Sequence, residues 1–66
     1  MPKTDEIWVA RIKYWPSDKE RYVVIKIYYA WKDGRLQFVP THCSEGDPIW
    51  ADDCHEFELI RKVDLR

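Results

Sequence analysis

Lysine and arginine are absent from Leu36 to Ile60, although the whole chain contains eleven basic residues. The same stretch holds six of the twelve acidic residues. Residues 1–35 hold eight basic and five acidic side chains, so the net charge of −1 conceals two segments of opposite sign. Segregated charge is typical of a surface that recognises a charged partner, and the pattern alone leaves open which partner that is.

The sequence also lacks features of disordered, exported and membrane proteins. It has only two glycines and no repeat or low-complexity tract, which excludes long flexible linkers. No apolar run approaches the ~20 residues of a membrane span. The first residues, MPKTDEIW, carry charges where a signal peptide needs an apolar run. We therefore expect a cytoplasmic protein without membrane association, whose two cysteines are reduced thiols.

The length of 66 residues predicts a single domain, residues 1–66, with a small core. Four tryptophans, four tyrosines and two phenylalanines compensate for the small size. Each buried aromatic side chain removes roughly 150–250 Å² from water. Ten rings exceed what such a core needs, so we expect some of them at the surface as contact residues.

Two segments of the basic half have the period of strands. Residues 6–15 alternate between apolar and basic side chains, which favours a strand. A helix that begins after Thr4 and ends at Pro16 is the alternative. Residues 21–31 are rich in β-branched and aromatic residues and apolar on both faces, so we expect a central strand. The following Asp33-Gly34 predicts a hairpin with a type I′ turn.

The second half of the chain predicts a shorter strand, a loop and a return strand. Residues 36–41 alternate, and Pro40 places the end of that strand at a sheet edge because proline cannot donate to a ladder. Residues 42–54 read as an irregular loop. Residues 55–64 alternate again and predict a strand, with a short C-terminal helix that begins near Asp52 as the alternative.

These segments predict an all-β domain, or an α+β domain if either helical alternative holds. The expected architecture is a small antiparallel sheet or an SH3-like half-open barrel of about four strands with one long acidic loop. The arrangement is loosely similar to Tudor-like modules. This is a likeness of pattern only, since no motif identifies a family.

Two His-Cys pairs occur in mirrored order on either side of residues 44–53, and four such ligands suit a tetrahedral zinc site. Adjacent residues in an extended chain point to opposite sides, so only one ligand of each pair would reach a common ion. We therefore predict no metal and no other cofactor. A disulfide between the two cysteines is the alternative, which cytosolic redox conditions disfavour. The residues concerned are His42, Cys43, Cys54 and His55.

Catalytic patterns are missing. A nucleophilic cysteine needs a cationic neighbour that lowers its thiol pKa, whereas carboxylates surround both cysteines in the sequence. The chain has no glycine-rich phosphate loop, and Ser17 and Ser44 are its only serines. We expect no enzymatic activity.

The acidic loop, residues 45–58, is the main functional candidate. Its carboxylates would steer a basic partner, and Trp50 would supply a cation–π face as the anchor. The sequence thus predicts a protein-interaction module or inhibitor, such as a phage or bacterial accessory protein that occupies a nucleic-acid-binding groove or a Tudor-like reader of cationic side chains. An open sheet edge would also permit a homodimer. The predicted partner-binding residues are Glu45, Asp47, Trp50, Asp52, Asp53 and Glu56.

The basic hairpin is the alternative site. Basic residues interleaved with rings on a sheet bind single-stranded nucleic acid by phosphate contact and stacking. The sequence pI of about 6.1 weighs against this function, since nucleic-acid-binding domains are usually far more basic. The residues that would bind nucleic acid are Arg11, Lys13, Tyr22, Lys26 and Arg35.

Overall fold

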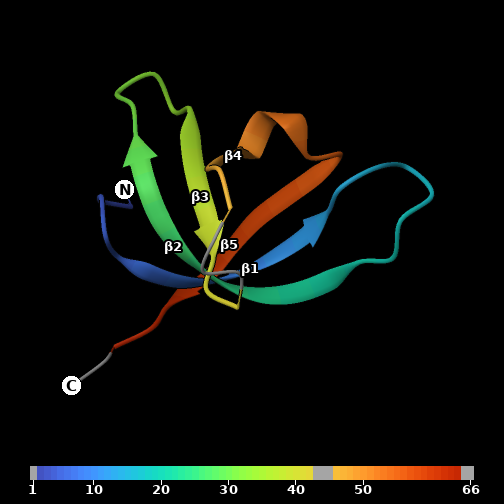
Figure 1. Cartoon of the computed structure of the whole chain (residues 1–66), viewed down its shortest axis with the longest axis horizontal. Coiled ribbons are helices and arrows are strands. Elements are labelled where there is room, and N and C mark those ends of the chain that lie inside the picture. Colours follow the sequence, from blue (N-terminus) through green and yellow to red (C-terminus); the bar gives the residue numbers. More distant parts are fainter. Residues whose placement is uncertain (1, 43–45, 65–66) are drawn as a thin grey trace.

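The computed structural model describes residues 2–42 and 46–64 and shows an antiparallel sheet in the order β4-β3-β2-β1-β5 (Figure 1). The predicted all-β class is confirmed, and the central place of β2 is confirmed with it. The elements are β1 (Ile7–Lys13), β2 (Arg21–Ala30), β3 (Leu36–Pro40), β4 (Ile49–Trp50), the 3₁₀ turn η1 (Ala51–Asp53) and β5 (Glu56–Lys62).

Two details of the predicted order are corrected. The stretch predicted to be irregular contains a fifth strand, β4, which is too short to show a period in the sequence. It pairs with Gln37 and Phe38 only, so the Pro40 end of β3 has no partner strand on that side among the described residues. Both helical alternatives are wrong, because residues 7–13 form β1, and the 3₁₀ turn η1 is followed by the strand β5.

The core lies on the concave face of the sheet. Alternation turns one set of side chains inward from β1, β2 and β3. Phe38 of β3 is fully buried, and its ring stacks on Phe57 of β5 with centroids 5.1 Å apart. Since β3 and β5 are not neighbours in the sheet, this contact requires the sheet to curl into the predicted half-open barrel (Figure 1). The buried core residues are Ala10, Ile12, Val23, Ile25, Ile27, Leu36 and Phe38.

A β-bulge changes which side chains of β2 face the core. The register with β3 shifts between Ile27 and Tyr29, so Tyr28 is an extra residue in the strand. As a result Ala30 packs against the core, while Tyr29 is exposed on the outer face. Strict alternation over residues 21–31 would place Tyr29 and Trp31 on the same face as Ile27, and the bulge puts them on the opposite face.

The hairpin between β2 and β3 is present, but its turn is not type I′. Gly34 donates a backbone hydrogen bond to the carbonyl of Trp31 at 3.1 Å, and Trp31 donates one to Arg35 at 2.8 Å. Gly34 has φ +97°, whereas Asp33 does not have the positive φ that a type I′ turn requires. This is the pattern of a three-residue loop closed by a left-handed glycine.

Candidate functional site

Arg11 of β1 neutralises the acidic residues of β5. Its Nη1 atom lies 2.9 Å from Glu56 and 3.0 Å from Glu20, and its Nε atom lies 3.3 Å from Glu58. Lys13 adds a longer contact of 4.0 Å to Glu56. These hydrogen bonds raise the pKa of Arg11, and the bond from Arg11 lowers the pKa of Glu56. Glu56, predicted to bind a partner, is therefore engaged within the sheet.

The basic residues of the predicted nucleic-acid site are paired in the same way. Besides Arg11 and Lys13, Lys26 lies 3.4 Å from Asp5, and the Nε atom of Arg35 lies 2.8 Å from Asp33. Tyr22, the aromatic member of the set, is 66% exposed on the outer face of β2. Each of the four cations thus has a carboxylate beside it, which reduces the positive charge that this face offers to phosphates.

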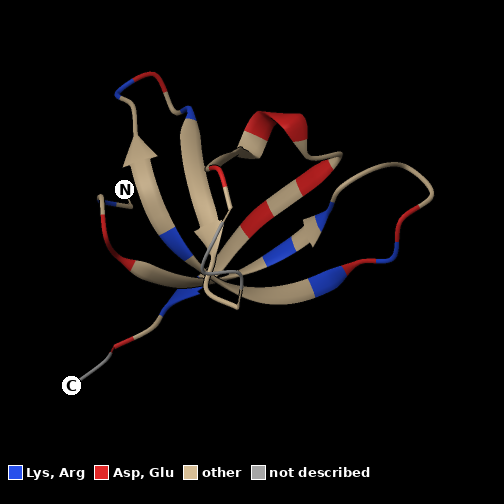
Figure 2. Cartoon of the chain, in the orientation of Figure 1, with Lys and Arg blue, Asp and Glu red and all other residues tan. Residues whose placement is uncertain are grey.

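Three acidic residues remain uncompensated. Asp47, Asp52 and Asp53 are exposed and form no ion pair with a basic residue in the described part of the chain. Asp52 and Asp53 lie on η1, which Figure 2 shows as an acidic band on the same side of the molecule as the acidic positions of β5. All three flank Trp50 in the sequence. Glu45, the remaining member of the predicted set, lies outside the described residues.

Trp50 belongs to an aromatic cluster on the outer face. Its ring stacks on Trp31 with centroids 4.8 Å apart and an interplanar angle of 24°. The ring of Tyr29 lies 4.5 Å from Trp31. The strand register explains the cluster, because Tyr29 of β2 and Trp50 of β4 both lie opposite Gln37 of β3. Trp50 is half-buried and is not among the residues that pack against the core.

The same cluster already holds a cation. The Cζ atom of Arg35 lies 5.7 Å from the ring centroid of Trp31 and 5.6 Å from that of Trp50. Both distances fall within the ~6 Å range of cation–π attraction. The sequence predicted a cation–π role for Trp50 but not for Trp31. Finding Trp31 required the bulge in β2, which places it on the outer face.

Three of the four residues of the zinc hypothesis lie in the described part of the chain. His42 and His55 are exposed, and Cys54 is a half-buried free thiol whose Sγ atom lies 3.8 Å from the Trp50 carbonyl oxygen. Burial, and then the charge of Asp53, raise the pKa of this thiol. No group of three His, Cys, Asp or Glu side chains in residues 2–42 and 46–64 is arranged to hold a metal ion. Cys43, and with it the disulfide alternative, lies outside the described residues.

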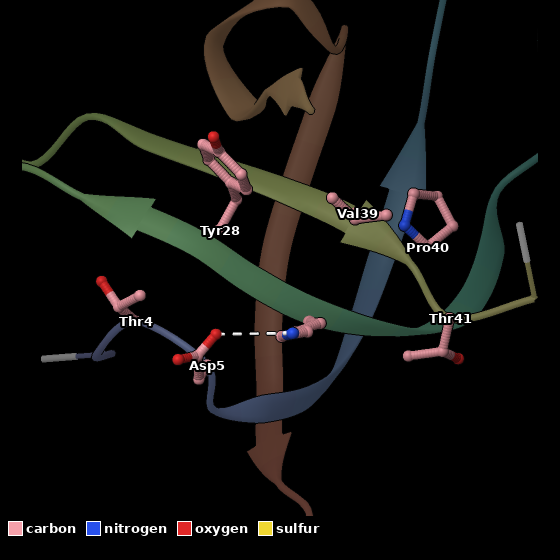
Figure 3. A pocket seen from close by; sticks show the side chains of 7 residues that line it. Thr4, Asp5, Tyr28, Val39, Pro40 and Thr41 are labelled. Carbon is pink, nitrogen blue, oxygen red and sulfur yellow. Dashed lines mark ion pairs between the residues drawn. The ribbon is translucent and has the colours of Figure 1, made fainter. Parts of the chain in front are cut away.

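A groove of about 550 Å³ that the sequence did not indicate lies on the outer face of β2 and β3 (Figure 3). The N-terminal segment forms one wall, since Asp5 donates a backbone hydrogen bond to Ile27 at 2.8 Å. Its two charged groups, Lys26 and Asp5, neutralise each other. The groove thus has no net charge that would select a ligand. Its lining residues are Thr4, Asp5, Lys26, Tyr28, Val39, Pro40 and Thr41.

Comparisons of the chain with protein-family models, with curated proteins and with solved structures found no match. Within the described residues there is no helix with the length and apolar character needed to span a membrane. The functional assignment therefore depends on the geometry of the charged and aromatic groups.

Proposed function

We propose that this protein is a non-enzymatic interaction module that docks a basic protein surface through Asp47, Asp52, Asp53 and Trp50. The observation that carries the proposal is the distribution of ion pairs. The other described acidic residues have a basic residue close by, including Asp64, which interacts electrostatically with Lys62. The three acids without such a residue all lie within seven positions of the sequence, around an aromatic anchor.

Uncompensated carboxylates and a surface tryptophan contribute differently to binding. Exposed charges act over the Debye length of about 8 Å and mainly raise the association rate and the specificity. A half-buried indole supplies the contact area that hot-spot residues need. A partner rich in arginine and lysine satisfies both requirements. Since Glu56 is held by Arg11, its role is to fix β5 against β1 rather than to meet the partner.

Binding of single-stranded nucleic acid through the basic hairpin has less support. The exposed ring of Tyr22 suits stacking, yet every basic residue of that site is paired with a carboxylate. Phosphate contact would first have to break these pairs.

The proposal is tested with a charge-matched pair of double variants. Asp52→Asn/Asp53→Asn removes two charges from the proposed site, and Asp5→Asn/Glu20→Gln removes two charges elsewhere. Asn suits position 5 because Asp5 has φ +71°, a conformation that Asn tolerates. The probe is a fluorescent arginine- and lysine-rich peptide, measured by anisotropy at about 50 mM salt.

Two exposed ion pairs contribute about 0.2–1 kcal/mol each, so the site variant should bind about two- to thirtyfold more weakly than the wild type. The control should lose less than half of that effect on a logarithmic scale. Equal losses in both variants would mean that the peptide senses only the total charge, and the docking site would be rejected.

A further inference from the structure

The side chain of Arg35, which belongs to the same chain, lies over the stacked rings of Trp31 and Trp50. Its guanidinium lies at nearly equal distances from the ring centroids of Trp31 and Trp50. Trp31 directly follows β2, and Trp50 is the last residue of β4. The side chain is about half exposed, with 53% of its surface accessible. The two rings therefore contact a guanidinium group within the folded chain.

The hairpin does not depend on this side chain for its shape. The backbone amide of Arg35 donates to Oδ1 of Asp33 at 3.0 Å, and its carbonyl accepts from Trp31 at 2.8 Å. Any residue except proline at position 35 can retain both bonds, because both use the backbone of that residue. Among residues 2–42 and 46–64, the guanidinium itself is held by Asp33 and by the rings. It is therefore free to leave the rings while the turn stays closed.

A partner's guanidinium has an advantage over Arg35 at this site. Arg35 pairs with Asp33 and makes no ion pair with Asp52 or Asp53, the carboxylates that follow Trp50 by two and three residues. An incoming arginine that stacks on Trp50 would approach a segment whose two carboxylates, Asp52 and Asp53, have no basic partner among the described residues. Arginine suits such a site better than lysine, because its planar guanidinium stacks on rings and forms paired hydrogen bonds with carboxylates.

We propose that the Trp31–Trp50 pair is a binding site for an arginine side chain of the partner and that Arg35 is an internal ligand which this arginine displaces. The proposal rests on the function proposed above and names the side chain that is recognised. Because Arg35 occupies the rings in some of the molecules, the partner's apparent affinity equals its intrinsic affinity multiplied by the fraction of molecules in which the rings are free.

The test compares Arg35→Ala with Arg61→Ala. Arg61 is exposed on β5 and forms no ion pair within the described residues, so its removal controls for the loss of one positive charge. Two probes are used, an arginine–glycine repeat peptide and its lysine–glycine counterpart. Titrations are followed by anisotropy, and circular dichroism confirms that each variant is folded. In the wild type, the Nε–H resonance of Arg35 is monitored by NMR during the arginine titration.

Arg35→Ala should bind the arginine peptide about two- to fivefold more tightly than Arg61→Ala does, which corresponds to removal of one exposed cation–π contact. The arginine peptide should bind more tightly than the lysine peptide, and the Arg35 resonance should shift as it binds. Unchanged or weaker binding by Arg35→Ala, relative to Arg61→Ala, overturns the displacement proposal while leaving the docking function intact. If neither peptide binds any form of the protein, the docking function itself fails.

Discussion

The contact between Phe38 and Phe57 makes a quantitative prediction about closure of the barrel. The two rings come from strands that are not neighbours in the sheet and stack with centroids 5.1 Å apart. Replacement of either by leucine should destabilise the fold by about 1–2 kcal/mol, which is less than the about 3–5 kcal/mol expected for alanine. A domain of this size has a free energy of unfolding of about 3–10 kcal/mol, so the leucine variants should remain folded.

A double-mutant cycle isolates the ring contact. Stacked aromatic pairs contribute about 0.5–1.5 kcal/mol beyond their buried area, so the double variant should be more stable by that amount than the sum of the single effects predicts. Urea unfolding followed by circular dichroism gives the four free energies. Phe57→Leu combined with Tyr28→Ala is the control, because Tyr28 lies on the opposite face of the sheet and should add independently. A coupling below about 0.3 kcal/mol between Phe38 and Phe57 would refute the curled arrangement.

Three further predictions follow from other parts of the structure. Trp50→Ala should lower the free energy of unfolding by about 1–2 kcal/mol, since it removes a surface ring pair, and it should abolish peptide binding. If the loss of stability in the same urea assay were as large as that of Phe38→Ala, Trp50 would belong to the core. Hydrogen bonds from Lys62 and the Lys3 backbone lower the pKa of Glu6 from 4.5 to about 2, so their stabilisation is complete above pH 4.5 and is lost as the pH falls towards 2. The stability difference between the wild type and Glu6→Gln should therefore shrink over that range in acid titrations, and a constant difference would contradict the assigned bonds. Burial and the charge of Asp53 raise the pKa of the Cys54 thiol. In a Cys43→Ser background, Cys54 should therefore react with iodoacetamide more slowly at pH 8 than a free cysteine does, and Asp53→Asn should accelerate the reaction. An unchanged rate in the Asp53→Asn variant would show that Asp53 does not contribute to the raised pKa.

Much of the sheet is readable from local pattern. The alternation of residues 6–15 predicted a strand, which is confirmed as β1, and the return strand β5 was predicted in the same way from residues 55–64. Alternation does not predict the faces of the residues after the bulge, because one extra residue in β2 moves every later side chain to the opposite face of the sheet. Nothing in the local sequence marks Tyr28 as that residue.

The candidate site could be predicted only in part from the sequence, because it depends on how the strands pair with one another. The sequence grouped Glu56 with the acidic loop, but the pairing of β1 with β5 puts it beside Arg11, forty-five positions away. Similarly, Trp31 and Trp50 meet because β3 lies between β2 and β4. The local sequence did predict the cluster of carboxylates around Trp50. Because no lysine or arginine occurs from Leu36 to Ile60, Asp47, Asp52 and Asp53 have no basic neighbour along the chain.

Mapping of the contact surface by NMR tests the docking claim most directly. An arginine–glycine repeat peptide is titrated into ¹⁵N-labelled protein at about 50 mM salt, and amide and indole shifts are followed residue by residue. The account predicts that the largest shifts fall on residues 47–53 and on the indole signals of Trp31 and Trp50. Shifts centred instead on the groove beside Tyr28 and Val39, or no shifts at saturating peptide, would contradict it.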